Sequence, residues 1–89
     1  MNKILTSPFD LVARVLDIDV SEVNENSAMG ETLNWDSLLH VAIIGELETS
    51  YGVTIPNEEI ENYVTMKSII ALYKKQSGEN KVRSLLQRL

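Results

Sequence analysis

Ser37 is the side chain whose type and setting offer the clearest chemistry in this sequence. It follows Trp35 and Asp36 at the point where a long loop meets the most apolar predicted helix. A hydroxyl on the first turn of a helix lies at the positive end of the helix dipole, where a phosphate is stabilised. Taken alone, Ser37 would be interpreted as a simple N-cap serine, because serine is a preferred cap residue. In its setting, we interpret it as the attachment point of a phosphate-linked prosthetic group.

Other kinds of chemical site find few residues to build on. The 89 residues include no cysteine and a single histidine, His40, which argues against thiolate metal sites, zinc spacings and a Ser-His-Asp triad. Asp17 and Asp19 resemble the start of a calcium loop, but Glu22 stands where such a loop needs glycine. We therefore expect no metal site, no catalytic residue and no enzymatic activity, and we interpret His40 as a packed histidine.

The composition predicts one folded domain with an acidic surface. The hydrophobic fraction is 44% and the net charge is -5, with no lysine or arginine between Arg14 and Lys67. Such a surface repels nucleic acid and anionic membranes and attracts basic patches on proteins. Acidity alone more often marks a solvated face, so the charge does not decide the function. Neither a membrane-spanning run nor a signal peptide is recognisable, and we expect a cytoplasmic monomer.

The first predicted helix covers residues 8–17, with Ser7 as its N-cap and Pro8 at the first helical position. Its core stripe is expected to be Phe9, Val12, Val15 and Leu16. Residues 18–35 then form a long loop, which in a small domain is usually functional or well packed. The residues expected to pin this loop to the core are Val20, Val23, Met29 and Leu33.

The second predicted helix covers residues 37–51 and ends at Gly52. Its buried stripe is expected to be His40, Ile43, Ile44, Leu47 and Tyr51. The first two turns are apolar on nearly every side, through Leu38, Leu39, Val41, Ala42, Ile43 and Ile44. A helix apolar all round must be buried or meet a partner. We therefore expect some of these residues to be exposed beside Ser37, and Trp35 to anchor the loop by packing.

The remaining chain predicts two more helices and a tail. Residues 53–56 are extended, Asn57 caps a short helix over residues 58–63, and Thr65 caps a helix that ends near Ser77. The buried side of that helix is expected to be Met66, Ile69, Ile70 and Tyr73.

The predicted fold class is all-α, a small bundle of three main helices plus one short helix. Residues 79–89 add a basic amphipathic helix at the C-terminus. Its apolar positions are Val82, Leu85, Leu86 and Leu89. We therefore divide the chain into a domain of residues 1–78 and an extension of residues 79–89.

The chain resembles the acyl carrier protein family over roughly residues 8–76. The resemblance lies in residues 35–38 (Trp-Asp-Ser-Leu), residues 46–48 (Glu-Leu-Glu), residues 51–56 (Tyr-Gly-Val-Thr-Ile-Pro) and residues 57–60 (Asn-Glu-Glu-Ile). Order and spacing both match the family's Asp-Ser-Leu motif and its continuation. Asp-Ser-Leu alone would be weak, but the combination is specific.

The resemblance implies an acyl-carrier-like fold and a covalent cofactor. A phosphopantetheinyl transferase would move 4′-phosphopantetheine from coenzyme A onto the Ser37 hydroxyl, and Asp36 would orient Ser37 and help recruit that transferase with its magnesium ion. The thiol at the end of the arm would carry an acyl group as a thioester, which suits a chain without cysteine.

The resemblance also implies docking to acyl-activating and acyl-transferring enzymes through basic patches. The acids expected to face those patches are Glu46, Glu48, Glu58, Glu59 and Glu61. The apolar residues expected to touch partners are Leu38, Leu39 and Val41. Such charges raise the rate of encounter more than the affinity, which suits a shuttle.

Departures from the family pattern favour a specialised pathway. Many fatty-acid carriers have acids where this chain has Leu39 and Ala42, and an exposed apolar residue where it has Gly45. A secondary-metabolite, glycolipid or polyketide-like pathway would fit. Two alternatives stay open: an aminoacyl or peptidyl carrier, and a helical interaction module whose Ser37 is never modified.

Overall fold

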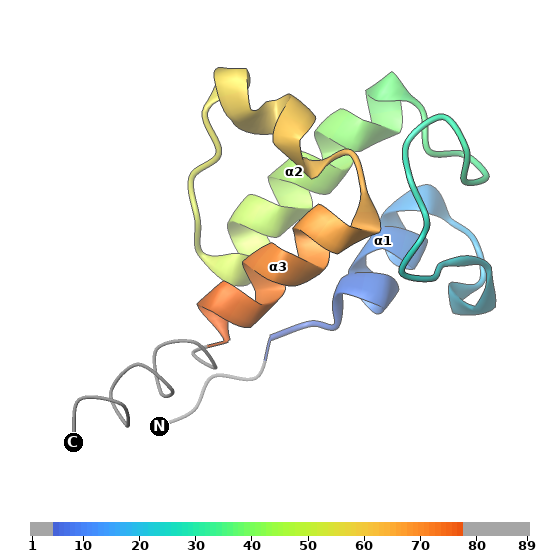
Figure 1. Ribbon diagram of the computed structural model, residues 1–89, viewed down its shortest axis with the longest axis horizontal. Helices are drawn as coiled ribbons and strands as arrows, with labels where there is room; N and C mark the ends of the chain where they lie inside the picture. The colour runs from blue at the N-terminus through green and yellow to red at the C-terminus, as the bar shows by residue number, and fades with distance from the viewer. Residues whose placement is uncertain (1–4, 78–89) are drawn as a thin grey trace.

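A computed structural model of the chain describes residues 5–77, and the helical elements predicted for this part are present (Figure 1). The order is α1 (Pro8–Leu16), a 3₁₀ helix η1 (Val20–Glu22), α2 (Ser37–Tyr51), a second 3₁₀ helix η2 (Asn57–Tyr63) and α3 (Met66–Gln76). The described part contains no strand, so the all-α fold class is confirmed. The predicted helix in residues 79–89 lies outside the described residues.

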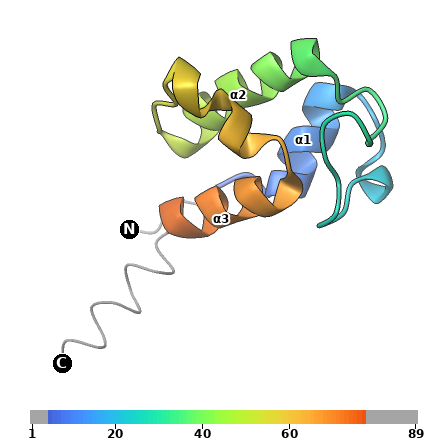
Figure 2. The same cartoon turned by 45° about the horizontal axis from the view of Figure 1, so that its top comes forward.

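Helix α1 packs against both α2 and α3. Figure 2 shows η2 next to α2, and α3 lies below these two elements in that view. The short helix η2 packs against both α2 and α3. No helix among the described residues is long and apolar enough to span a membrane.

Helix α1 begins where its sequence predicts, but its cap differs. Pro8 occupies the first helical position, while the side chain of Ser7 makes no capping hydrogen bond. The backbone oxygen of Ser7 instead accepts the N–H of Leu11 at 2.9 Å, which starts the helical ladder. Ser7 is therefore the N-cap residue, as predicted, but the capping hydrogen bond expected from its side chain is not formed. The helix ends at Leu16, and its C-cap residue, Asp17, adopts a left-handed conformation with φ 56°.

Helix α2 has the predicted bounds and the predicted buried face. Gly52 takes the left-handed conformation, with φ 66°, and donates its N–H to the oxygen of Glu48 at 3.0 Å. Glycine has no Cβ to oppose this conformation, so the helix stops there. The expected core side chains of α2 are all buried: His40, Ile43, Ile44, Leu47 and Tyr51.

The loop between α1 and α2 is held differently from the prediction. Val23 is buried and Met29 packs against the core, but Val20 and Leu33 are 45% and 57% exposed. The prediction that these last two residues pin the loop was wrong. The loop is pinned by Val23 and Met29, as predicted, and by Trp35, the predicted anchor, which is 1% exposed and belongs to the same core cluster as Val23.

Backbone pairing fastens the middle of this loop to the start of α3. The N–H of Met29 donates to the oxygen of Val64, and the N–H of Met66 donates to the oxygen of Ser27, each at 2.9 Å. These bonds form an isolated antiparallel bridge between Ala28 and Thr65. Buried backbone groups need such partners, so the loop keeps a fixed path without being an α-helix or a strand.

The two C-terminal elements show one correction and one confirmation. The short helix is 3₁₀, begins at Asn57 itself and has no side-chain cap, so the predicted capping role of Asn57 was wrong. The Thr65 hydroxyl does cap α3, because it accepts the N–H of Ser68 at 3.2 Å. Met66 and Ile69 are fully buried, and Ile70 and Tyr73 pack partly against the core.

Candidate functional site

Ser37 is exposed at the first position of α2, and its neighbour Asp36 is the N-cap. Oδ1 of Asp36 accepts the N–H of Leu39 at 2.8 Å, and the backbone oxygen of Asp36 accepts the N–H of His40 at 2.9 Å. The capping role that could have explained the serine is therefore filled by the residue before it. This leaves the Ser37 hydroxyl on the surface at the positive end of a 15-residue helix.

The end of the helix suits a phosphate. Capping uses the N–H of Leu39, and the N–H groups of Ser37 and Leu38 have no acceptor within residues 5–77. Unpaired N–H groups and the helix dipole together favour an anion. The residues present therefore fit a phosphate ester on the Ser37 hydroxyl.

The chain that leads into the site is fixed to α1. Asn34 has φ 66°, a conformation that asparagine tolerates better than most residues. Its side-chain Nδ2 donates to the backbone oxygen of Leu16 at 2.9 Å, close to the end of α1. The next residue, Trp35, accepts the N–H of Gly30 at its backbone oxygen at 2.8 Å. The segment that precedes Ser37 is thus hydrogen-bonded to the end of α1 and to an earlier part of the same loop.

The Trp35 indole is bonded to His40, one turn into α2. Trp35 Nε1 donates to His40 Nδ1 at 3.1 Å, and the rings stack with centroids 6.1 Å apart and an interplanar angle of 26°. The other ring nitrogen of His40, Nε2, lies 3.0 Å from the backbone oxygen of Ile60 in η2. The predictions of a packing tryptophan and a packed histidine are confirmed. The hydrogen bond between these two side chains was not predicted, because no residue spacing or motif in the sequence indicates it.

Apolar side chains surround the serine on the surface of α2. Leu38 is 77% exposed and Val41 59% exposed, and Ala42 is exposed as well, while Leu39 is half-buried against the core. The expectation that apolar residues lie exposed beside Ser37 is therefore confirmed.

The five predicted docking acids fall into two groups. Glu58, Glu59 and Glu61 are exposed on η2. Glu46 lies 3.7 Å from the Arg14 guanidinium, and Glu48 accepts the N–H of Ile55 at 2.9 Å through Oε2. These last two carboxylates are half-buried and already have partners within the chain.

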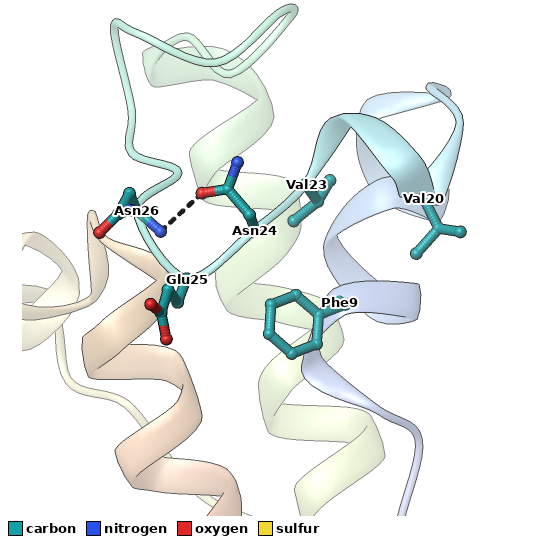
Figure 3. A pocket seen from close by; sticks show the side chains of 6 residues that line it. All are labelled: Phe9, Val20, Val23, Asn24, Glu25 and Asn26. Carbon is teal, nitrogen blue, oxygen red and sulfur yellow. Dashed lines mark hydrogen bonds between the residues drawn. The ribbon is translucent and has the colours of Figure 1, made fainter.

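A second surface feature lies away from the serine, beside the N-terminal half of α1. It is an open hollow of about 600 Å³ (Figure 3). Its lining residues are Phe9, Val20, Val23, Asn24, Glu25 and Asn26. The N–H of Asn26 donates to Oδ1 of Asn24 at 2.8 Å, so part of its polar rim is internally paired. Within residues 5–77, none of these residues forms a hydrogen bond with Ser37, and this part of the chain has no cluster of side chains suited to a metal ion.

Residues 9–73 match a family described as a phosphopantetheine attachment site. The chain is 33% identical over 72 residues to polyketide-8 synthase acyl carrier protein 2 of Streptomyces avermitilis, covering 81% of this chain and 83% of that protein. It is 38% identical over 61 residues to an acyl carrier protein of Helicobacter hepaticus, covering 68% and 80%. It is 31% identical over 78 residues to a meromycolate extension acyl carrier protein of Mycolicibacterium aurum, covering 88% and 80%.

Proposed function

This chain belongs to the acyl carrier protein family, and we propose that Ser37 is the residue to which its 4′-phosphopantetheine arm is attached. Proteins of this family are carriers and not catalysts, and the arm supplies the thiol that this cysteine-free chain lacks. The observation that carries the proposal is the exposed position of Ser37 at the start of α2, with the cap supplied by Asp36.

Loading would form an ester between the Ser37 hydroxyl oxygen and the phosphate of the arm. The bond that breaks is the pyrophosphate bond of coenzyme A, the adenosine bisphosphate portion leaves, and a phosphopantetheinyl transferase accepts the hydroxyl proton. Asp36 is exposed and uses Oδ1 for the cap. Its second oxygen, Oδ2, is not used in the cap, and through it Asp36 would help to recruit the transferase with its magnesium ion.

Partner enzymes would dock on α2 and η2. Leu38 and Val41 offer exposed apolar contacts near Ser37, and acids on η2 offer charge to basic patches. These acids are Glu58, Glu59 and Glu61. Leu39, Glu46 and Glu48 would contribute less, because they are half-buried and both acids already have partners in the chain.

The cargo would belong to a specialised pathway. Leu39 and Ala42 make α2 less acidic than the helix of a general fatty-acid carrier, and Gly45 stands where such a helix often has an exposed apolar residue. The names of two relatives, a polyketide synthase carrier and a meromycolate extension carrier, are compatible with this class. We keep the carrier domain at residues 1–78 and the extension at residues 79–89, since the family match ends at residue 73 and α3 at Gln76.

Intact-mass spectrometry tests the attachment site. The protein is incubated with coenzyme A, magnesium and a broad-specificity transferase, alongside Ser37→Ala and the control Ser21→Ala, which changes an exposed serine of η1. We expect the wild type and the Ser21 variant to gain the mass of one phosphopantetheine and the Ser37 variant to gain none. A Ser37 variant that still gains the arm would move the site elsewhere. Protein from its native cell with Ser37 unmodified would support an interaction module instead.

A further inference from the structure

One side of the open hollow, where Phe9 lines it, lies close to the C-terminal end of α3. The backbone oxygen of Thr6, just before α1, accepts the hydroxyl of Tyr51 at 2.8 Å. The ring of Tyr51 lies 5.8 Å, centroid to centroid, from that of Tyr73, near the end of α3. The part of the chain that follows α3 therefore starts close to this side of the hollow.

The other side of the hollow is fixed at the N-terminal end of α3. Glu25 and Asn26 line the hollow there (Figure 3). The next residue, Ser27, accepts the N–H of Met66, the first residue of α3, at 2.9 Å. The residues that line the hollow are thus held near both ends of the same helix.

The hollow combines apolar surface with a negative charge. Phe9 is half-buried and Val20 is 45% exposed, so both offer apolar area to an occupant. Glu25 is exposed, and the ion pair found within residues 5–77 does not involve it. Apolar surface beside an acid suits a segment that is both amphipathic and basic.

Residues 79–89, which lie outside the described part of the chain, have this character in their sequence. Lys81 and Arg88, seven positions apart, would lie along one edge of the apolar face of a helix. A helix this short is marginal in water by itself, so its apolar face needs a surface to cover. The residues of that face are Val82, Leu85, Leu86 and Leu89.

The length and starting point of this segment fit the hollow. Helix α3 has 11 residues, and residues 79–89 are equal in number, so each spans about 16 Å as a helix. Ser77 and Gly78 leave a short connection, and glycine allows the chain to turn back. A helix that runs back along α3 brings its last turn, with Arg88, to the end of α3 where Glu25 lies.

We propose that residues 79–89 fold back along α3 and dock in the hollow of the same chain. Their apolar face packs on Phe9 and the apolar lining beside it, and Arg88 faces Glu25. Apolar burial provides most of the stabilisation, because an exposed ion pair contributes little. This docking does not require Ser37 to carry the arm, and it leaves α2 and η2 free for partner enzymes.

A nitroxide spin label on the full-length chain tests the docking. The sequence has no cysteine, so Ser84→Cys gives a single attachment point, and on a helix position 84 lies opposite the apolar face. The label weakens the nuclear magnetic resonance signals of nearby amides. We expect the amides of Phe9 and Asn26 to lose more intensity than that of Val41 on α2. Equal losses at these three amides would overturn the proposal.

Two changes in the labelled chain provide a matched comparison. Leu86→Asp places a charge on the apolar face, and Gln87→Asp places the same charge on the opposite face. We expect Leu86→Asp to abolish the extra loss of intensity at Phe9 and Asn26, and Gln87→Asp to preserve it. The same result for both variants would contradict docking through the apolar face.

A charge exchange tests the direction of the segment and does not depend on the folding of Leu86→Asp. Glu25→Lys and Arg88→Glu should each reduce the loss of intensity at Asn26, and the two changes together should restore it. Glu31→Lys, at another exposed acid of the loop, serves as the control and should have no effect. A double variant without recovery would overturn the placement of Arg88 beside Glu25.

A mixed sample distinguishes the chain's own segment from that of a second copy. Isotope-labelled chains without nitroxide are mixed with nitroxide-labelled chains that carry no isotope, so only contacts between copies weaken the signals. We expect no loss of intensity at Phe9 and Asn26 in this mixture. A loss there would overturn docking within one chain and would indicate that copies exchange their C-terminal segments.

Discussion

The hydroxyl of Tyr51 donates a hydrogen bond of 2.8 Å to the backbone oxygen of Thr6, which ties the last residue of α2 to the chain before α1. The ring of Tyr73, from α3, lies 5.8 Å away, centroid to centroid, with an interplanar angle of 55°. Burial, with a smaller contribution from Tyr73, raises the pKa of Tyr51 to about 12. The end of α2 farthest from Ser37 is thus fixed by a phenol that must stay protonated.

This phenol predicts a loss of stability at high pH. The folded-state pKa lies above the ordinary tyrosine value of about 10, so the folded state binds the proton more tightly. The contribution of Tyr51 is fully present below about pH 10 and is lost as the pH rises towards 12. Urea denaturation should show that the free energy of unfolding falls more steeply between pH 8 and pH 11.5 for the wild type than for Tyr51→Phe. Parallel declines would contradict the prediction.

Two variants of Asp36, the N-cap of α2, distinguish the role of its carboxylate in stability from its proposed role in loading. Asp36→Ala removes the acceptor of the Leu39 N–H and should lower the free energy of unfolding by about 1 kcal/mol. Asp36→Asn keeps an acceptor oxygen and should stay close to wild type. If the charge recruits the transferase, both variants will load slowly in a mass-spectrometric time course. An Asn variant that loads like wild type would limit Asp36 to capping.

Gly45 within α2 and Gly52 at its C-cap should respond in opposite directions to replacement by alanine. Gly45 is exposed in mid-helix with nothing within 4 Å of an added Cβ, so Gly45→Ala should stabilise the fold by about 1 kcal/mol. Gly52 also has open space, but its φ of 66° disfavours a side chain. Gly52→Ala should therefore cost about 1 to 2 kcal/mol. Thermal denaturation measures both, and shifts of the same sign would refute this account.

The exposed apolar residues beside Ser37 should matter for partners and not for stability. The double change Leu38→Ala and Val41→Ala removes side chains that are mostly in solvent, so the melting temperature should change little. The rate at which a cognate enzyme transfers an acyl group to the loaded protein should fall about tenfold. Val20→Ala, at an exposed valine of η1, serves as the control. If the double variant and Val20→Ala lower the transfer rate equally, the result would argue against α2 as the docking surface.

Local signals in the sequence were enough to predict much of the fold. Asp36 and Gly52 bracket α2, and each acts through atoms within a few residues along the chain, so the bounds of the helix were confirmed. The buried stripe followed from helical spacing alone. Thr65 likewise caps α3 as predicted, since its partner is only three residues away.

Long-range contacts explain what the sequence did not predict. Val20 and Leu33 are apolar but exposed, because the path of the loop is set by the backbone pairing of Ala28 with Thr65. The contact between His40 and Ile60 joins residues of different helices, and the spacing of residues along the sequence does not predict it. The sequence motif was enough to single out Ser37 as the candidate attachment residue, whereas the hydrogen bond between Trp35 and His40 could be found only in the structure.

The pairing of Ala28 with Thr65 also bears on how the chain folds. It closes a loop of backbone that contains all of α2 and η2. Closing a long loop costs chain entropy, which the contacts formed inside it must offset. We therefore expect the bridge to form after the helices have packed and to be among the first contacts to open locally. The amide hydrogens of Met29 and Met66, which make the bonds of this bridge, would then exchange with solvent before those in the middle of α1 and α2, and they would report the local opening that precedes unfolding of the bundle.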